Sequence, residues 1–212
     1  MEMLELEFVN GENLQKFTVD SNLLPLARIV LIIEELASIL AYLHQHGIIY
    51  MDIKAKNVLV LPKGIKLLDF GMTQFIDRGR EPKGTVYSLL STPEYVPPEM
   101  ATTFSATSAA DVFQLGILFY QLVAGCHPFA RVAFTEGDAY RESEQLKYAL
   151  ANVYVQPNFQ HPRFSECGNL TDILKLMLNK NPQDRPTAND VTSLFAKWSQ
   201  AGGIDDGRDG TH

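Results

Sequence analysis

The sequence predicts a mainly α-helical fold with short β-hairpins, and three features support this prediction. Two long apolar segments, at residues 25–46 and 108–124, have the composition of buried helices. Two short apolar runs that flank Gly64 have the pattern of a hairpin. With 212 residues, 46% of them hydrophobic, the chain is long enough to bury the core of one domain.

The first expected element is a short strand over residues 3–9. Leu4, Leu6 and Phe8 alternate there with Met and Glu residues, and this period of two is typical of a half-buried strand. The Asn10-Gly11 pair is expected to end it in a turn. Such a strand leaves its backbone hydrogen-bonding groups open unless a downstream segment or another chain pairs with it.

The longest helix is expected between Pro25, which suits a first helical turn, and Gly47, which stops it. A hairpin should follow over residues 58–68, whereas residues 71–100 show no sustained period and predict a long functional loop. A second apolar helix is predicted at residues 108–124. Two or three further helices are predicted at about residues 139–152, 170–179 and 188–198.

The composition argues against several kinds of partner. A net charge of -7 disfavours nucleic acid or an anionic membrane, since either would call for clustered Lys and Arg. The apolar segment Leu23–His46 carries Arg28 and two Glu residues, too many charges for a membrane span. Cys126 and Cys167 lack C-x-x-C spacing, which predicts no structural disulfide and a cytoplasmic protein.

A run of chemically useful residues extends from Asp52 to Asn57, and Asp69-Phe70-Gly71 follows after the predicted hairpin. Asn57 and Asp69 offer the hard oxygens that Mg²⁺ prefers. Asp52 has a carboxylate that can aim a nucleophile, and Lys54 can place a positive charge near a phosphoryl group. An isolated Asp in a loop is more often a turn-capping residue. Lys54 and Asn57, at the second and fifth positions after it, favour the catalytic interpretation.

Five segments in a single order carry a family resemblance. They are HGIIYMDIKAKNVLV, IKLLDFG, STPEYVPPE, DVFQLGILFYQLVAGCHPF and NPQDRPTANDV. Together they resemble the large lobe of a protein kinase, over about residues 4–198. The resemblance implies a protein-kinase-like C-terminal lobe that uses ATP and Mg²⁺.

The resemblance also implies catalytic roles. Asp52 would be the catalytic base, Lys54 would stand near the transferred phosphoryl group, and Asn57 and Asp69 would bind the metal. Thr92 matches a threonine that bonds the catalytic Asp in serine/threonine-specific members. The Lys two residues after the Asp points to the same substrate class.

Three residues resemble the nucleotide-binding positions of the family. The backbone carbonyl of Glu7 and the amide of Val9 would meet the adenine edge, and Leu59 would lie beneath the ring. An ordinary strand explains residues 3–9 equally well by pattern alone. An apolar cleft floor, formed by residues such as Leu6, Phe8, Leu59 and Leu67, is expected to appear as an exposed patch in a monomer.

Other residues are expected to support the site. Tyr50 would pack under Phe70, next to Gly71. Asp111 is the only acid on an apolar helix, so it should accept backbone amides from the loop that holds Tyr50 to Asp52.

Glu99 and Arg185 resemble a structural ion pair of the family. Loss of either partner would leave a buried charge unpaired, at a cost of about 3 to 5 kcal/mol. The five His residues show no metal-ligand spacing and are expected to be ordinary.

The sequence departs from the family at Met51, where an arginine usually meets a loop phosphate. Thr73, Thr85, Tyr87, Ser88 and Ser91 carry hydroxyl groups, but charge-paired activation by a phosphate is not expected without that cation.

The residues before the predicted hinge are too few for a glycine-rich flap and a phosphate-binding lysine. We therefore expect a truncated kinase with doubtful ATP affinity and little activity alone. Residues 1–12 would be a remnant hinge strand, 13–199 the lobe, and 200–212 a flexible tail.

Three functions remain open at this stage. The first is a serine/threonine protein kinase, present here as its large lobe and acting on a protein substrate. The second is a single-lobe pseudokinase that binds a partner protein, such as a chain that completes the small lobe. The third and weakest is a small-molecule phosphotransferase, against which the TPEYVPPE segment argues.

Overall fold

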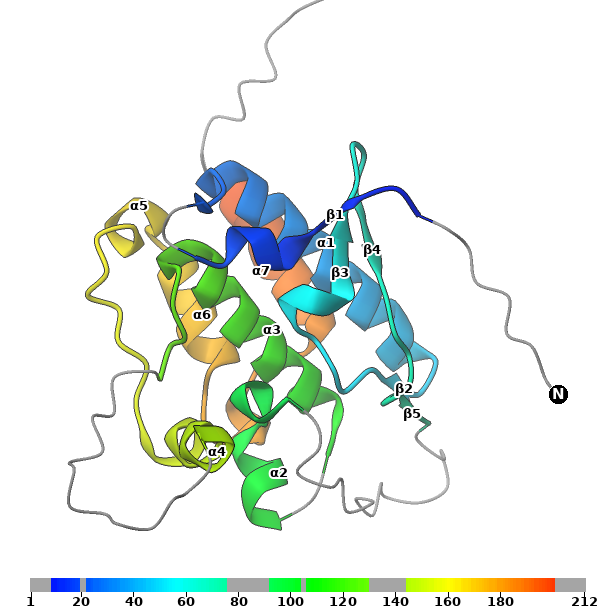
Figure 1. Cartoon of the computed structure of the whole chain (residues 1–212), viewed down its shortest axis with the longest axis vertical. Coiled ribbons are helices and arrows are strands. Elements are labelled where there is room, and N and C mark those ends of the chain that lie inside the picture. Colours follow the sequence, from blue (N-terminus) through cyan, green and yellow to red (C-terminus); the bar gives the residue numbers. More distant parts are fainter. Residues whose placement is uncertain (1–8, 20–21, 76–91, 104–105, 130–143, 201–212) are drawn as a thin grey trace, which may run out of the picture.

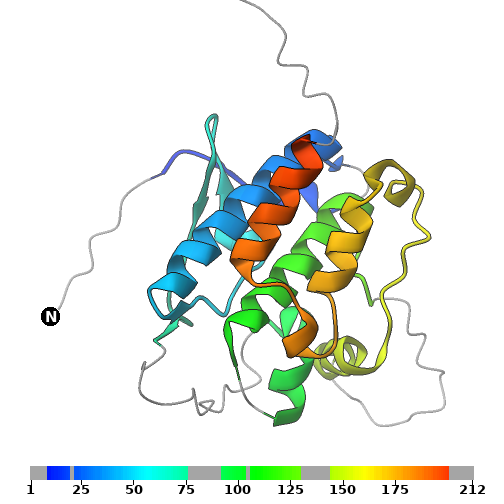
Figure 2. The same ribbon diagram turned by 180° about the vertical axis from the view of Figure 1, so that it is seen from behind.

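The structure is a computed structural model that describes residues 9–19, 22–75, 92–103, 106–129 and 144–200. Its centre is α3 (Ser108–Ala124), which packs against α1 (Leu26–Gln45), α6 (Leu170–Met177) and α7 (Ala188–Gln200). Figure 2 shows these four helices side by side, while the short strands lie at the edge of α1 (Figure 1). The predicted mainly helical fold with short β-hairpins is confirmed.

The two long helices begin and end where the sequence predicts. Pro25 caps the start of α1, and the positive φ of Gly47, 73°, allows the chain to turn just after its end. Thr107 caps α3 by accepting the Ala109 amide at 3.3 Å, and Gly125 ends α3 in a left-handed conformation.

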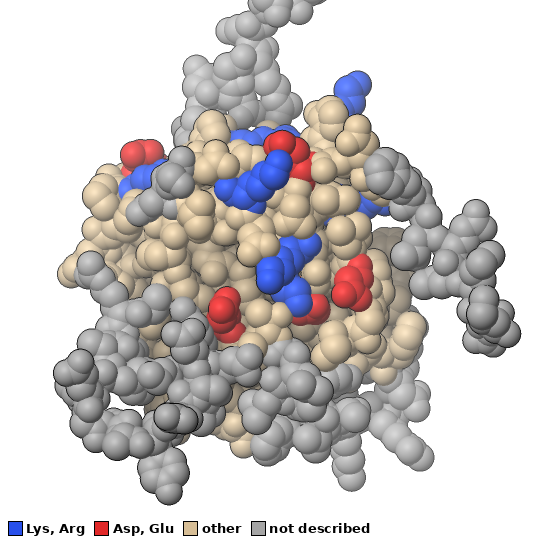
Figure 3. All heavy atoms as spheres, viewed as in Figure 1, with Lys and Arg blue, Asp and Glu red and all other residues tan. Residues whose placement is uncertain are grey.

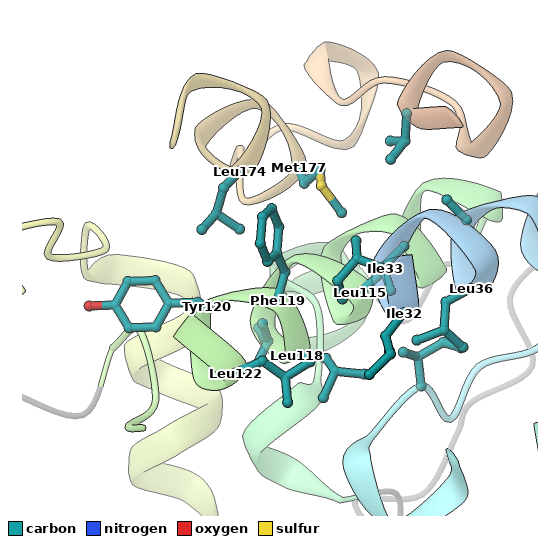
Figure 4. Packing of buried hydrophobic residues seen from close by; sticks show 14 of the residues in the cluster. Ile32, Ile33, Leu36, Leu115, Leu118, Phe119, Tyr120, Leu122, Leu174 and Met177 are labelled. Atoms are coloured by element: carbon teal, nitrogen blue, oxygen red, sulfur yellow. The ribbon is translucent and has the colours of Figure 1, made fainter. Parts of the chain in front are cut away.

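Apolar burial explains why α3 is central. Fourteen of its seventeen residues are buried, so it has almost no surface face. Figure 4 shows how side chains of α1, α3 and α6 meet in one cluster. The labelled members are Ile32, Ile33, Leu36, Leu115, Leu118, Phe119, Tyr120, Leu122, Leu174 and Met177.

The predicted hairpin is present as β3 (Val58–Val60) and β4 (Ile65–Leu67), with Val58 opposite Leu67. Gly64 makes its turn with a φ of 83°. β1 (Glu12–Asn13) pairs with β3, and β2 (Ile48–Ile49) pairs with β5 (Gln74–Phe75).

The strand predicted over residues 3–9 lies outside the described residues except for Val9, which belongs to no strand. The partner of β3 instead comes from β1, a few residues further on.

The long-loop prediction for residues 71–100 was only partly right. Besides β5, this segment contains the 3-10 helix η4 (Pro93–Tyr95), and the short helix α2 (Pro98–Thr103) starts within it. Pro93 occupies the first turn of η4 and Pro98 that of α2, where no amide hydrogen is needed.

Among the described residues, four helices rather than two or three follow α3. The additional one is α5 (Phe164–Cys167), and α4 (Glu144–Tyr154) ends two residues later than expected. Short 3-10 helices complete the chain: η1 (Leu14–Phe17), η3 (Ala55–Asn57) and η5 (Pro182–Asp184). The expected tail at 200–212 lies outside the described residues apart from residue 200, which ends α7.

Cys126 and Cys167 do not form a disulfide with each other, as expected. In the part of the chain that the structure describes, no helix combines the length and the apolar character needed to cross a bilayer.

Candidate active site

The Asp52 carboxylate lies in the loop between β2 and η3, where only 6% of the residue is exposed. The side-chain amide of Asn57 forms two hydrogen bonds with Asp52. Asn57 Nδ2 donates to the Asp52 carbonyl oxygen at 3.0 Å and to Asp52 Oδ2 at 2.7 Å. The tight turn of η3 brings these two residues together, which fixes the direction of the carboxylate.

Lys54 connects Asp52 to a distant segment. Its Nζ lies 2.8 Å from Asp52 Oδ2 and 2.8 Å from the hydroxyl oxygen of Thr92. The sequence-based interpretation paired Thr92 with the Asp directly, whereas here the long lysine side chain stands between them. All three residues predicted to be catalytic therefore lie together.

Asp69 is placed beside Asn57 through the backbone of Leu68. The Leu68 amide donates to the Asn57 carbonyl oxygen at 2.8 Å, and the Tyr50 hydroxyl donates to the Leu68 carbonyl oxygen. Asp69 has a φ of 56°, and one of its carboxylate oxygens accepts the Gly71 amide at 3.0 Å. A positive φ is uncommon outside glycine, and such residues cluster at active sites and other functional positions.

The oxygens of Asn57 and Asp69 suit Mg²⁺. The Nδ2 of Asn57 is committed to Asp52, so its side-chain oxygen is the atom left for a metal. The Asp69 carboxylate is solvent-exposed. No group of three or more His, Cys, Asp or Glu residues suited to a metal occurs in the described ranges. Mg²⁺ needs no such group, because it commonly takes one or two protein ligands plus phosphate and water.

Asp111 holds the loop that precedes Asp52. It is completely buried in α3, and it accepts the Tyr50 amide at 2.9 Å and the Met51 amide at 2.7 Å. The amide contacts predicted for Asp111 are therefore present. Met51 has a φ of 72°, and the fixed amides on Asp111 keep the loop in this unfavourable conformation.

Two further residues of this anchor were not found from the sequence. Gln114 Oε1 accepts the Ile53 amide at 3.0 Å, and its Nε2 donates to the Met51 carbonyl oxygen at 3.0 Å. His44 Nε2 lies 2.8 Å from Asp111 Oδ2. The only available signal was the spacing of Gln114, which follows Asp111 by three residues and so shares its helix face.

Tyr50 is a neutral donor under the Asp69-Phe70-Gly71 turn. Burial raises its pKa well above the usual range, and the negative charges of Asp52 and Asp69 raise the pKa further. Its ring meets Phe70 edge-on, with centroids 5.3 Å apart. The predicted packing of Tyr50 against Phe70 is thus present.

Glu99 and Arg185 form the predicted ion pair. Two parallel contacts of 2.7 Å join the guanidinium to both carboxylate oxygens, and both residues are buried. Arg185 also lies over the Phe113 ring, with Cζ 4.7 Å from its centroid. The pair connects α2 to the segment after η5, away from Asp52 in sequence.

The adenine contacts predicted at the hinge are not brought together by the described residues. Glu7 lies outside them, and Val9 is half-buried without a regular strand. Leu59 is half-buried in β3, opposite Lys66 and Asn13.

The apolar cleft floor was predicted to be exposed, and the structure corrects this for its described members. Leu59 and Leu67 are half-buried, and Leu67 packs against the main core because β4 lies close to α1. Of the hydroxyl residues considered for phosphorylation, Thr85, Tyr87, Ser88 and Ser91 lie outside the described residues.

Basic and acidic side chains are interspersed over the face shown in Figure 3, where they form no broad patch of one sign among the described residues. This distribution differs from the clustered positive charge of nucleic-acid-binding surfaces.

Comparison with known proteins shows which family the chain belongs to. The sequence matches the protein kinase domain family over residues 2–195. It is 33% identical over 181 residues to atypical protein kinase C from Drosophila melanogaster, covering 85% of this chain and 28% of that protein. It is 30% identical over 199 residues to the serine/threonine-protein kinase PknA from Mycobacterium tuberculosis, covering 91% of this chain and 43% of that protein.

A third relative is protein kinase C eta type from Mus musculus, which is 33% identical over 181 residues, covering 85% of this chain and 24% of that protein. The chain therefore spans less than half of the length of each of these relatives.

Proposed function

Because this chain belongs to the protein kinase family, we propose that it carries the large-lobe half of a serine/threonine kinase active site. The reaction would transfer the terminal phosphoryl group of ATP to a serine or threonine hydroxyl of a protein. The observation that carries this proposal is the position of Lys54 Nζ, 2.8 Å from both Asp52 Oδ2 and Thr92 Oγ1.

Each residue has a chemical task in this proposal. Asp52 would orient the attacking hydroxyl and accept its proton, and Asn57 and Lys54 keep the carboxylate in one orientation. Lys54 would place its positive charge beside the phosphoryl group as it is transferred. Asn57 and Asp69 would hold Mg²⁺, which neutralises phosphate charge when bound.

We further propose that these 212 residues turn ATP over very slowly on their own. The printed sequence contains no G-x-G-x-x-G segment, and loss of one preorganised donor at a transition state often costs about 3 kcal/mol. The missing donors would come from a small lobe in the same gene product or in a partner chain. Residues 1–12 would then be its hinge strand, 13–199 the lobe and 200–212 a tail. Glu7, Val9 and Leu59 would contact adenine.

A cytoplasmic location is part of the proposal. Its support is that neither cysteine is used in a disulfide with the other, which suits a reducing compartment.

A second candidate is a pseudokinase that binds a partner protein. It is favoured by Met51, which is 2% exposed and packs in an apolar cluster with Ile49, Val96 and Met100. An apolar side chain there fixes the loop without a phosphate-binding cation. The intact contacts among Asp52, Lys54 and Thr92 favour the enzyme over this candidate.

The test joins the small lobe of a serine/threonine kinase ahead of residue 2 and measures phosphoryl transfer from ATP and Mg²⁺ to serine and threonine peptides. We expect transfer by this small-lobe fusion and a loss of about a thousandfold or more in the Asp52→Asn variant. A fusion that folds and binds ATP but transfers nothing would support the pseudokinase instead.

A further inference from the structure

The side chain of Asn152 in α4 forms hydrogen bonds with the turn that follows Thr92. Asn152 Nδ2 donates to the carbonyl oxygens of Glu94 and Val96, each at 2.9 Å. These two oxygens belong to the segment Pro93–Val96, which consists of η4 and the residue that follows it. One amide group therefore satisfies two backbone acceptors and fixes the distance between them.

Asn152 is itself rigidly placed. It is completely buried, although its helix also carries surface residues such as Tyr154, which is 76% exposed. Lys180 Nζ donates to the Asn152 carbonyl oxygen at 2.5 Å and lies 3.7 Å from the Phe129 ring centroid. The helix α4 packs against η4 and α2 (Figure 1). Asn152 thus connects α4 to a turn 56 residues earlier in the chain.

His127 supports the same turn from the segment after α3. Its Nδ1 accepts the Phe129 amide at 3.3 Å, so the proton of the neutral ring is on Nε2, which lies 2.8 Å from the Glu94 carbonyl oxygen. Asn152 and His127 therefore both donate to Glu94. The Tyr95 hydroxyl completes the support by donating to Gln121 of α3.

The turn leads directly to the proposed site. The Tyr95 amide donates to the Thr92 carbonyl oxygen at 3.0 Å, so the position of Thr92 depends on the turn. The Thr92 hydroxyl accepts from Lys54, whose Nζ contacts the Asp52 carboxylate. The contacts of Asn152 are therefore linked to Asp52 through the backbone of residues 92–96 and then through the polar contacts of Thr92 and Lys54.

We propose that Asn152 is a positioning residue for phosphoryl transfer, acting through the Pro93–Val96 turn and Thr92 on Lys54 and Asp52. This inference rests on the proposed function for its catalytic consequence. Its structural part stands on contacts within the described residues alone.

The first experiment needs no activity and uses the 212-residue protein. Amide hydrogen exchange is measured by NMR in the wild type, in Asn152→Ala, and in Asn152→Asp, which keeps the shape but loses the donor. We expect exchange of the Tyr95 and Val96 amides to rise about tenfold in both variants, with amides of α7 changed by less than about twofold.

Two control variants accompany this experiment. Asn189→Ala removes an exposed asparagine of α7, and Leu174→Ala destabilises the main core at a residue of α6. Neither should change exchange at Tyr95 selectively. Unchanged Tyr95 exchange in the Asn152 variants, or an equal rise over α3, α7 and the turn, would overturn the proposal.

The second experiment measures kinetics in the small-lobe fusion. We expect Asn152→Ala to lower kcat about tenfold while the KM for ATP stays within about twofold. In a Thr92→Ala background the same substitution should have almost no further effect, because its path to Asp52 is already broken. Equal losses in both backgrounds would overturn the proposal. Inactivity of the wild-type fusion would instead refute the proposed function, and the exchange experiment would still decide the placement of the turn.

Discussion

The carboxylate of Asp111, completely buried in α3, accepts the backbone amide of Met51 at 2.7 Å. This contact explains how the loop before Asp52 keeps a positive φ at a non-glycine residue. The loop that precedes Asp52 is thereby attached to α3, in which fourteen of seventeen residues are buried. The orientation of Asp52 therefore depends on a helix that forms part of the hydrophobic core.

We predict that Asp111→Ala lowers the free energy of unfolding by about 3 kcal/mol, because the Tyr50 and Met51 amides lose their acceptor inside the protein. Urea unfolding at neutral pH measures this. Asp172→Ala is the matched control, since that Asp is exposed and its pair with Lys175 should contribute less than about 1 kcal/mol. Similar losses in the two variants would contradict the anchoring role.

Arg185→Ala should destabilise the protein by about 3 to 5 kcal/mol, because the Glu99 carboxylate would remain buried without its partner. The double variant Glu99→Leu with Arg185→Met should recover part of this loss, since no uncompensated charge is left. Chemical denaturation of Glu99→Leu, of Arg185→Met and of the double variant gives the coupling free energy. Strict additivity of the two changes would show that the pair is not coupled.

Stability should fall in acid partly because of His127. Burial lowers its pKa to about 4, so the unfolded chain, with a pKa near 6.5, takes up a proton at higher pH than the folded protein. The His127 contribution is therefore fully present above pH 6.5 and is lost as the pH falls toward 4. The loss amounts to about 3 kcal/mol. Comparison of wild type with His127→Gln isolates this effect from carboxylate titration, and parallel pH profiles for the two proteins would refute it.

Thr92→Ala should lower kcat of the small-lobe fusion about tenfold or more, because Lys54 loses the acceptor that holds it beside Asp52. Thr92→Ser keeps the hydroxyl and should retain most of the activity. Steady-state kinetics with a serine peptide measure both variants. An equal loss in the two would mean that the hydroxyl is not what matters.

Elements with strong local signals could be predicted from the sequence. Residues that start or end an element mark the apolar runs of α1 and α3 and the turn at Gly64. The bounds of these elements could therefore be predicted to within a few residues. The helices α2 and α5 have only six and four residues. So short a helix has no periodic pattern and is stabilised by its tertiary neighbours.

The candidate site likewise combines residues with a local sequence signal and residues placed by long-range contacts. Asp52, Lys54, Asn57 and Asp69 lie on one local unit, so their spacing was informative. The His44 contact with Asp111 spans 67 residues and depends on how α1 packs on α3. The contact of Asn152 with the Pro93–Val96 turn spans 56 residues and likewise depends on how helices pack. No local pattern reports such contacts.

In the proposed function, the oxygens of Asn57 and Asp69 form one metal site. The most direct test adds Mn²⁺ in small amounts to the 212-residue protein and measures paramagnetic broadening of its amide NMR signals. We predict broadening centred on Asn57, Leu68 and Gly71 that excess Mg²⁺ reverses and that Asp69→Ala abolishes. Broadening spread over other acidic surface residues, and equal in Asp69→Ala, would contradict the account.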